Sequence, residues 1–345
     1  MKLREPDRRR LKKIVRDFSR KRVLVIGDLM LDEYVYGSTD RISREAPVLI
    51  LAFNGSMLMP GGAGNACANI RALGAVAMPV GLVGEDEPGE RLVSLLKDSG
   101  IATESIVCSA EFESIQKTRI LAGGFHCAKQ QVIRVDRGKR VGVRRRVEDS
   151  LIEKAAALVP SVDAVLFSDY GYGVVSNRLR TRVTGLAREA KKVICADSRF
   201  ELARFRGATV ATPNESEAGP AVGEEIRDTE SLLSVGRRLM KRLGLRSLIL
   251  TQGSSGMTVF EGRGVPIHVP IFGSDEIADV TGAGDTVAAA VTLSLCSGAT
   301  AVEASCIATY ASSVVVMKRG TAVVGPDELS AAISKGKIGP LSALE

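Results

Sequence analysis

The sequence contains the stretch DVTGAGDTVAAAVTLSL at residues 279–295, where small residues and an aspartate precede a long run of small apolar residues. Glycine permits backbone angles that let neighbouring amide groups converge, and the start of a helix carries partial positive charge. We therefore predict an anion hole at Gly282, Ala283 and Gly284, with Asp285 beside it as a general base. An aspartate that only caps the following helix is the competing interpretation.

Composition limits the classes of protein to which this chain could belong. It has 345 residues, of which 45% are hydrophobic and 25% charged, which suits one large α/β domain or two smaller ones. Six scattered cysteines without a C-x-x-C pair disfavour a zinc site and indicate the reducing cytoplasm. The uncharged run at 286–302 is short and weakly apolar for a membrane span.

The net charge of +7 is concentrated before residue 20 and at residues 137–146. With no tryptophan and 4% aromatic residues, the chain has little material for a surface that stacks on bases. We therefore expect solvated basic faces, with neither nucleic acid nor a membrane as partner. Attraction of an anionic substrate remains open.

The chain alternates apolar, β-branched runs with helix-like stretches, which predicts a doubly wound α/β fold. Several runs end in polar or glycine-rich turns, and ligands of open parallel sheets bind beyond the carboxyl ends of the strands. The residues at these ends are Asp169, Asp197, Asn214, Glu217, Thr251 and Gly253.

Two segments, residues 33–53 and 114–136, alternate apolar and polar residues as half-exposed strands do. We predict that they form a small antiparallel sheet that covers the site as a lid. The predicted folded domain spans residues 20–332, between a basic segment at 1–19 and a loose tail at 333–345.

The strand ends and turns carry further candidate ligands. Glu217 could orient water around Mg²⁺, although Asn214 and Glu217 are equally suited to cap a helix. Thr251, Gly253 and Gly256 could hold nucleotide phosphates, although TQGSSG alone is more typical of a plain hairpin turn.

Another group of polar and glycine residues suits a sugar. Asp28 and Asp32 are paired carboxylates for sugar hydroxyls, and Gly61, Gly62 and Asn65 would let a sugar approach the backbone. The same glycines imitate a dinucleotide fingerprint, but the preceding segment is a poor strand that contains a proline. The chain has no P-loop motif, and its two histidines are not near a G-x-S-x-G turn, which disfavours a serine hydrolase.

The order of these motifs over residues 20–332 resembles the ribokinase (PfkB) family of sugar kinases. Longer stretches, such as GDLMLDEYVYGSTDRISREAPV at 27–48 and DVTGAGDT at 279–286, resemble its heptose-7-phosphate kinase group. The resemblance implies a three-layer α/β/α sandwich. It also implies ATP- and Mg²⁺-dependent phosphorylation of the anomeric hydroxyl of D-glycero-D-manno-heptose 7-phosphate, which yields the 1,7-bisphosphate.

The resemblance also implies roles for individual residues. It makes Asp285 the base and Asn214 and Glu217 the ligands of ATP and Mg²⁺, and it implies a homodimer through the lid. Asp279 and Thr281 would bind a monovalent cation such as K⁺. The resemblance further assigns Thr251, Gly253 and Gly256 to the nucleotide, and Asp28, Gly62 and Asn65 to the sugar. Independently of the resemblance, we predict Asp32, Gly61 and Asp169 as further ligands of the sugar, and Arg41 and Arg134, in the lid segments, as ligands of its phosphate.

The chain departs from the heptose kinase pattern at three places. Tyr172 stands where those kinases commonly have lysine, Ser198 and Arg199 stand where they have proline and lysine after an aspartate, and residues 122–129 are extra. Another sugar or sugar phosphate, or a catalytically silent sugar- or nucleotide-binding regulator, are therefore the alternative functions.

Overall fold

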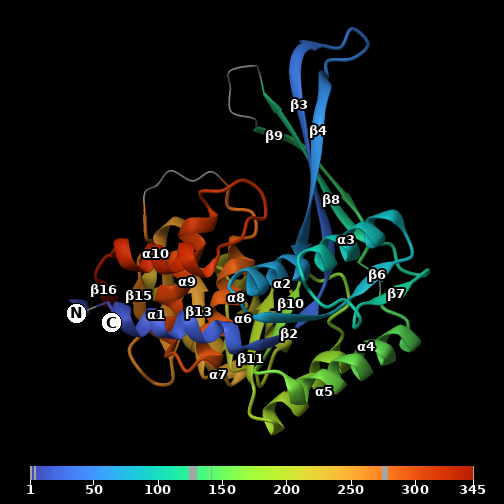
Figure 1. Ribbon diagram of the computed structural model, residues 1–345. Coiled ribbons are helices and arrows are strands. Elements are labelled where there is room, and N and C mark those ends of the chain that lie inside the picture. Colours follow the sequence, from blue (N-terminus) through green and yellow to red (C-terminus); the bar gives the residue numbers. More distant parts are fainter. Residues whose placement is uncertain (1, 4, 124–129, 141, 274–278, 345) are drawn as a thin grey trace.

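The centre of the molecule is a ten-stranded sheet with the order β1-β16-β15-β14-β13-β12-β11-β10-β2-β5 (Figure 1). The structure is a computed structural model that describes residues 2–3, 5–123, 130–140, 142–273 and 279–344. Six strands of the sheet run parallel to one another, which confirms the predicted doubly wound α/β fold. They are β13 (Ser247–Thr251), β12 (Val210–Ala211), β11 (Val193–Ser198), β10 (Ala164–Asp169), β2 (Arg22–Gly27) and β5 (Val76–Val80).

The other four strands extend one edge of the sheet in antiparallel pairs. They are β14 (Met257–Glu261), β15 (Ile267–Val269), β16 (Leu341–Ala343) and β1 (Lys2–Leu3). Because β16 pairs with both β15 and β1, and the side chain of Leu341 is buried, the prediction of a loose tail is wrong.

Helices cover both faces of the sheet and complete the three layers. Residues of α1, α2, α3, α8, α9 and α10 share one buried cluster, and those of α4, α5, α6 and α7 share the other. On the first face these helices are α1 (Arg8–Asp17), α2 (Ala63–Ala72), α3 (Glu87–Asp98), α8 (Ala283–Cys296), α9 (Ala301–Val315) and α10 (Pro326–Lys335). On the second they are α4 (Arg145–Leu158), α5 (Asn177–Glu189), α6 (Glu215–Val222) and α7 (Thr229–Leu243).

The basic N-terminal segment belongs to the folded domain. Leu11, Ile14 and Val15 of α1 lie in the core, although the exposed side of the same helix is basic. Helix α1 packs against α10. The predicted boundary at residue 20 therefore does not divide the structure, because apolar residues at helical spacing anchor the segment.

The lid is a separate sheet with the order β4-β3-β8-β9 that projects from the main domain (Figure 1). Its strands are β3 (Leu29–Ile42), β4 (Leu49–Gly62), β8 (Ile115–Gly123) and β9 (Gln130–Arg137). The prediction of a wholly antiparallel lid is wrong, because β3 and β8 pair in parallel. These two strands leave the main domain in the same direction. Most of the extra residues at 122–129 lie outside the described part of the chain.

A short two-stranded sheet of β6 (Leu82–Gly84) and β7 (Val107–Ser109) lies between β5 and β8 in the chain.

Candidate active site

A cavity of about 470 Å³ lies where the parallel strands end, below the lid strands and beside the start of α8. It brings together residues from the lid, the main sheet and the helices, as expected for a ligand site of an open parallel sheet. The residues that line this cavity include Asp32, Gly62, Lys117, Arg134, Asp169, Tyr170, Asp197, Arg199, Asn214, Glu217, Thr251, Thr281, Gly282, Gly284, Asp285 and Thr321.

Asp285 lies in the first turn of α8, with its side chain almost fully buried at the cavity wall. Its Oδ2 atom accepts a hydrogen bond from Asn65 Nδ2 at 2.7 Å, and its Oδ1 atom accepts one from the Tyr170 hydroxyl at 2.9 Å. Burial raises the pKa of Asp285 to about 7. A carboxylate with such a pKa is suited to accept a proton near neutral pH.

The turn before Asp285 has the backbone geometry that its glycines predict. Gly282 has a φ of 79°, and a Cβ atom there would lie 2.5 Å from Asn65 Nδ2, so a larger residue would displace the side chain that holds Asp285. The amide of Ala283 donates to the Val280 carbonyl at 3.2 Å. The prediction of three free amides is therefore corrected at Ala283, whose amide has an internal acceptor, while Gly284 is exposed at the cavity.

A second cavity of about 300 Å³ adjoins the first and shares Asn214, Thr251, Val280 and Gly284 with it. It is mainly apolar. Its other lining residues include Gly253, Gly256, Ile271, Phe272, Val287 and Val316. An apolar slot beside a polar phosphate-sized site is suited to a purine ring.

Both interpretations of TQGSSG are compatible with the structure. Its residues connect β13 and β14 as an antiparallel hairpin, and Gly253 and Gly256 also line the apolar cavity. A Cβ atom at Gly256, where φ is 92°, would lie 2.3 Å from the Val269 carbonyl oxygen. Glycine therefore keeps the hairpin in contact with β15.

Asn214 and Glu217 form the predicted capping pair and also line the first cavity. The Asn214 side chain accepts from the Glu217 amide at 3.0 Å, and Glu217 accepts from the Asn214 amide at 2.9 Å. Burial, followed by the negative charge of Glu217, raises the pKa of Asp197 well above its ordinary value. Two neighbouring carboxyl groups at a cavity wall attract a cation.

The described residues contain no cluster of three or more histidine, cysteine, aspartate or glutamate side chains that could hold a metal. The two carboxyl groups of Glu217 and Asp197 line the polar cavity and are oxygen donors of the kind that suits Mg²⁺, which keeps several waters and takes ligands from substrate phosphates.

Asp28 does not line the cavity, contrary to its predicted contact with sugar hydroxyls. Its side chain is fully buried and accepts hydrogen bonds from the amides of Tyr170, Tyr172 and Val174. Burial raises its pKa to about 6. The structure therefore gives Asp28 a different role, in which it holds the turn that follows β10.

The other predicted sugar ligands fall into two groups. Asp32 and Gly62 line the cavity, whereas Gly61 and Asn65 lie behind them. Gly61 packs directly on Asp32, because a Cβ atom there would lie 2.6 Å from Asp32 Oδ2. Asn65 is buried and contacts Asp285, so its amide supports the base.

Two cationic residues of β8, Lys117 and Arg119, were not among the predicted ligands. Arg119 Nη1 lies 2.7 Å from Asp32 Oδ1 in a largely buried ion pair. Lys117 is 8% exposed, and its Nζ atom lies 5.3 Å from the ring centre of Tyr170 and 5.8 Å from that of Tyr172. The alternation of β8 places both cations on one face, a signal that could have identified them.

Further cations and an acid surround the same cavity. Arg134 lines it and pairs with Asp136 at 2.8 Å, and Arg199 also lines it. Asp169 accepts a hydrogen bond from Ser198 Oγ at 2.7 Å, and burial raises its pKa. The side chain of Arg41, the other predicted phosphate ligand, lies outside the described part of the structure.

The predicted cation ligands Asp279 and Thr281 lie together beside the start of α8. Asp279 Oδ1 accepts from the Thr281 amide at 2.9 Å, and Oδ2 accepts from the Gly320 amide at 3.0 Å. The buried Thr321 hydroxyl at the same cavity has no hydrogen-bond partner among the described residues. An oxygen atom of this kind could act as a ligand of K⁺.

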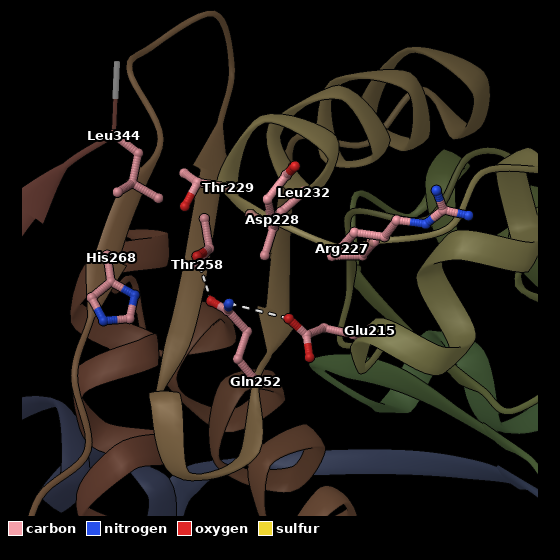
Figure 2. Close-up of a pocket in the computed structure, with 10 residues that line it drawn as sticks. Glu215, Arg227, Asp228, Thr229, Leu232, Gln252, Thr258, His268 and Leu344 are labelled. Atoms are coloured by element: carbon pink, nitrogen blue, oxygen red, sulfur yellow. Dashed lines mark hydrogen bonds between the residues drawn. The ribbon is translucent and has the colours of Figure 1, made fainter.

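A further cavity of about 460 Å³ lies on the other side of the β13–β14 hairpin (Figure 2). The Thr258 hydroxyl donates to Gln252 Oε1 at 2.7 Å, and Gln252 Nε2 donates to Glu215 Oε1 at 3.3 Å. None of the predicted site residues lines this cavity. Its central polar groups bind one another, so we assign it no part of the chemistry.

Within the described residues, we find no helix that combines the length and the apolar character needed to cross a membrane.

Residues 20–328 match the family described as pfkB family carbohydrate kinase. The "Bifunctional protein HldE" of Trichlorobacter lovleyi is 37% identical over 329 residues, which are 95% of this chain and 66% of that protein. The "Bifunctional protein HldE" of Nitrobacter winogradskyi is 39% identical over 313 residues, 90% of this chain and 63% of that protein. The chain thus spans about two thirds of the length of these relatives.

Solved structures share the fold. Arabidopsis thaliana ribokinase complexed with ribose and ATP has a TM-score of 0.69 at 17% identity, over 91% of this chain and 98% of that one. Phosphofructokinase-2 from Escherichia coli in complex with potassium has a TM-score of 0.73 at 18% identity, over 91% of this chain and 100% of that one. The expected ribokinase-like sandwich is therefore confirmed.

Proposed function

Because this chain belongs to the pfkB family of carbohydrate kinases, we propose that it transfers the γ-phosphoryl group of ATP to a sugar phosphate. The proposed acceptor is the anomeric hydroxyl of D-glycero-D-manno-heptose 7-phosphate, and the product is the 1,7-bisphosphate. Similarity to the HldE proteins and the heptose-kinase-like motifs support this choice. The observation that carries the proposal is the buried Asp285 carboxylate in the wall of the polar cavity, next to Gly284, which lines both the polar and the apolar cavity.

The apolar cavity would hold the adenine, and the shared residues at Asn214, Thr251 and Gly284 would face the phosphates. Asp285 would accept the proton of the attacking hydroxyl while Gly284 and the positive end of α8 stabilise the transferring phosphoryl group. Bound Mg²⁺ would neutralise phosphate charge, with Glu217 and Asp197 on its side of the cavity.

The cations in the wall support an acceptor that already carries a phosphate. Lys117, Arg134 and Arg199 all line the polar cavity, and no ion pair is found for Lys117 or Arg199 within the described chain. A buried ammonium group without an anionic partner is unfavourable, and a substrate phosphate would compensate it. An unphosphorylated sugar would leave this charge unpaired.

The test is ADP release by the purified protein with Mg-ATP across a panel of acceptors. The panel contains both anomers of heptose 7-phosphate, the unphosphorylated heptose, and unrelated sugars and sugar phosphates. We expect selective turnover of the heptose phosphate by the wild type and none by Asp285→Asn. Turnover of another sugar phosphate would identify that compound as the substrate in place of the heptose phosphate. Tyr172 and Arg199, which depart from the heptose kinase pattern, would then be the first residues to examine for the change in specificity. Absence of turnover with ATP still bound would favour the regulatory binding protein.

The proposed enzyme forms a homodimer through the lid. Arg134 of β9 lines the cavity, so the alternating neighbours Ile133 and Val135, each 53% exposed, point to the opposite face of the lid. Phe53 and Leu49 of β4 are 68% and 54% exposed. An apolar sheet face of this kind needs a cover, and a second copy of the lid supplies one of matching shape.

Free thiols at Cys67, Cys108, Cys195, Cys296 and Cys306 together with use of ATP fit a cytoplasmic enzyme. The neighbouring Asp279, Thr281 and Thr321 oxygens would hold K⁺ beside the anion hole, where a cation would support binding of the phosphates. Faster turnover in KCl than in tetramethylammonium chloride would support this K⁺ site. Equal turnover rates in the two salts would exclude it.

A further inference from the structure

We infer that Tyr170 is a positioning residue for the reacting carboxylate. Its hydroxyl and the Asn65 amide together fix the plane of the Asp285 carboxylate, so that one remaining lone pair faces the acceptor hydroxyl. The inference rests on the proposed function, because it assigns a role within the same phosphoryl transfer.

Three separate elements meet at the Asp285 carboxylate. Asp285 belongs to α8, Asn65 to α2, and Tyr170 to the turn after β10. The two donors bind different oxygens, at 2.7 Å for Asn65 Nδ2 and 2.9 Å for the Tyr170 hydroxyl. A carboxylate can accept about four hydrogen bonds, so two fixed donors restrict its rotation and still leave acceptor capacity for a substrate. Tyr170 also lines the cavity and can therefore contact what binds there.

The turn that carries Tyr170 is itself held in place. The buried carboxylate of Asp28 accepts from the amides of Tyr170 at 2.8 Å, Tyr172 at 3.1 Å and Val174 at 3.3 Å. Rotation of the Tyr170 side chain is limited from the other side by Lys117, whose Nζ atom lies 5.3 Å from its ring centre. The hydroxyl is thus directed at Asp285 by contacts to its backbone and to its ring.

The groups around Asp285 set its pKa, and this pKa would change if the hydrogen bond from Tyr170 were lost. Burial and, to a smaller extent, Asp32 of β3 raise the pKa of Asp285, while the hydrogen bonds from Asn65 and Tyr170 and then Lys117 of β8 lower it. Two further titratable groups also interact with it, namely Asp197 of β11 and the buried Cys67 thiol of α2. Removal of the Tyr170 hydroxyl would take away one of the hydrogen bonds that lower the pKa of Asp285. The pKa of Asp285 would therefore rise.

The experiment compares Tyr170→Phe with Tyr172→Phe. Both variants keep the aromatic ring that contacts Lys117, but only Tyr170 donates to Asp285. For Tyr170→Phe we expect kcat to fall by about 10- to 100-fold, with KM for ATP unchanged and the acid limb of the pH profile moved to higher pH. Tyr172→Phe should retain the wild-type acid limb.

A substrate-independent measurement separates this inference from the proposed function. Asp285 can be titrated by carbon-13 NMR of selectively labelled aspartate carboxyl groups, with Asp285→Asn to identify its signal. A higher midpoint in Tyr170→Phe than in the wild type is the expected result, and it requires no sugar. An unchanged midpoint together with unchanged kcat would overturn the inference, as would an equal shift of the Asp285 midpoint in Tyr172→Phe. Failure of the wild type on every sugar would instead count against the proposed function.

Discussion

At the scale of single residues, the Asp285 carboxyl group has a folded-state pKa of about 7 against an ordinary value of 3.8, because it is buried. The folded state therefore binds this proton more tightly than the unfolded state does. The contribution of this group to stability is present at low pH and is lost as pH rises from about 4 to about 7. Burial thus gives a base of suitable strength at the expense of stability at neutral pH.

We predict that Asp285→Asn lowers kcat by several orders of magnitude and leaves the fold intact. The wild-type rate should rise with pH through about 7, since the carboxylate form is the active one. In thermal unfolding, the variant should lose less stability than the wild type between pH 5 and pH 8. Near-normal turnover in the variant would show that Asp285 is not the base.

We also predict that Lys117→Met, which keeps the length of the side chain and removes its charge, raises KM for a phosphorylated sugar by about 10-fold or more. KM for ATP should change little. Lys139→Met, at an exposed position, serves as the control. An unchanged KM for the sugar phosphate in Lys117→Met would exclude an ion pair between this lysine and the substrate.

The sequence predicted the residues whose position follows from a local backbone motif. Gly282 and Asp285 belong to one turn, and Asn214 and Glu217 to one helix start, so their spacing alone places them. Asp28 illustrates the limit of such reasoning. Its carboxylate is directed away from the cavity by amides more than 140 residues later in the chain, a contact that no local pattern contains.

At the scale of elements, the start of α6 has two roles that a pair of substitutions can separate. Glu217→Gln keeps an oxygen that can accept from the Asn214 amide, so the helix cap should survive while the negative charge is lost. We expect wild-type stability and a higher Mg²⁺ requirement. Glu217→Ala should show the same requirement and also lose about 1 kcal/mol of stability. Chemical denaturation and Mg²⁺ titration of ADP release measure the two effects.

A normal Mg²⁺ requirement in Glu217→Gln would leave Glu217 with the capping role alone.

Element prediction was most successful for the buried α8 and the parallel strands, whose apolar runs are long and clear. It failed at the termini. The prediction for the segment before residue 20 rested on its basic residues alone and overlooked the helical spacing of Leu11, Ile14 and Val15. These three residues form the buried side of α1. The polar tail around β16 gained its structure from partners in β15 and β1, so its own residues carried little signal. Partners distant in sequence also determined the parallel pairing of β3 and β8.

At the scale of the whole molecule, the proposed lid dimer predicts a change in mass. Ile133→Glu combined with Val135→Glu should convert a dimer to a monomer, because two charges would enter the apolar contact. Light scattering after gel filtration measures this mass. Val265→Glu, at an apolar residue of similar exposure far from the lid, is the control. A monomeric wild type, or a dimeric double variant, would contradict the lid interface.

The pairing of β1 with β16 also constrains the order in which the protein can assemble. The long-range hydrogen bonds of the arginine side chains of α1 reach the C-terminal part of the chain. Arg8 donates to the Ser334 carbonyl and Arg10 to Glu303 and the Gly298 carbonyl. Helix α1 therefore cannot complete these contacts until residues 298–334 have been synthesised, and its apolar side stays without these partners until then. Until then Leu11, Ile14 and Val15 would offer a recognition site to a chaperone that binds emerging chains.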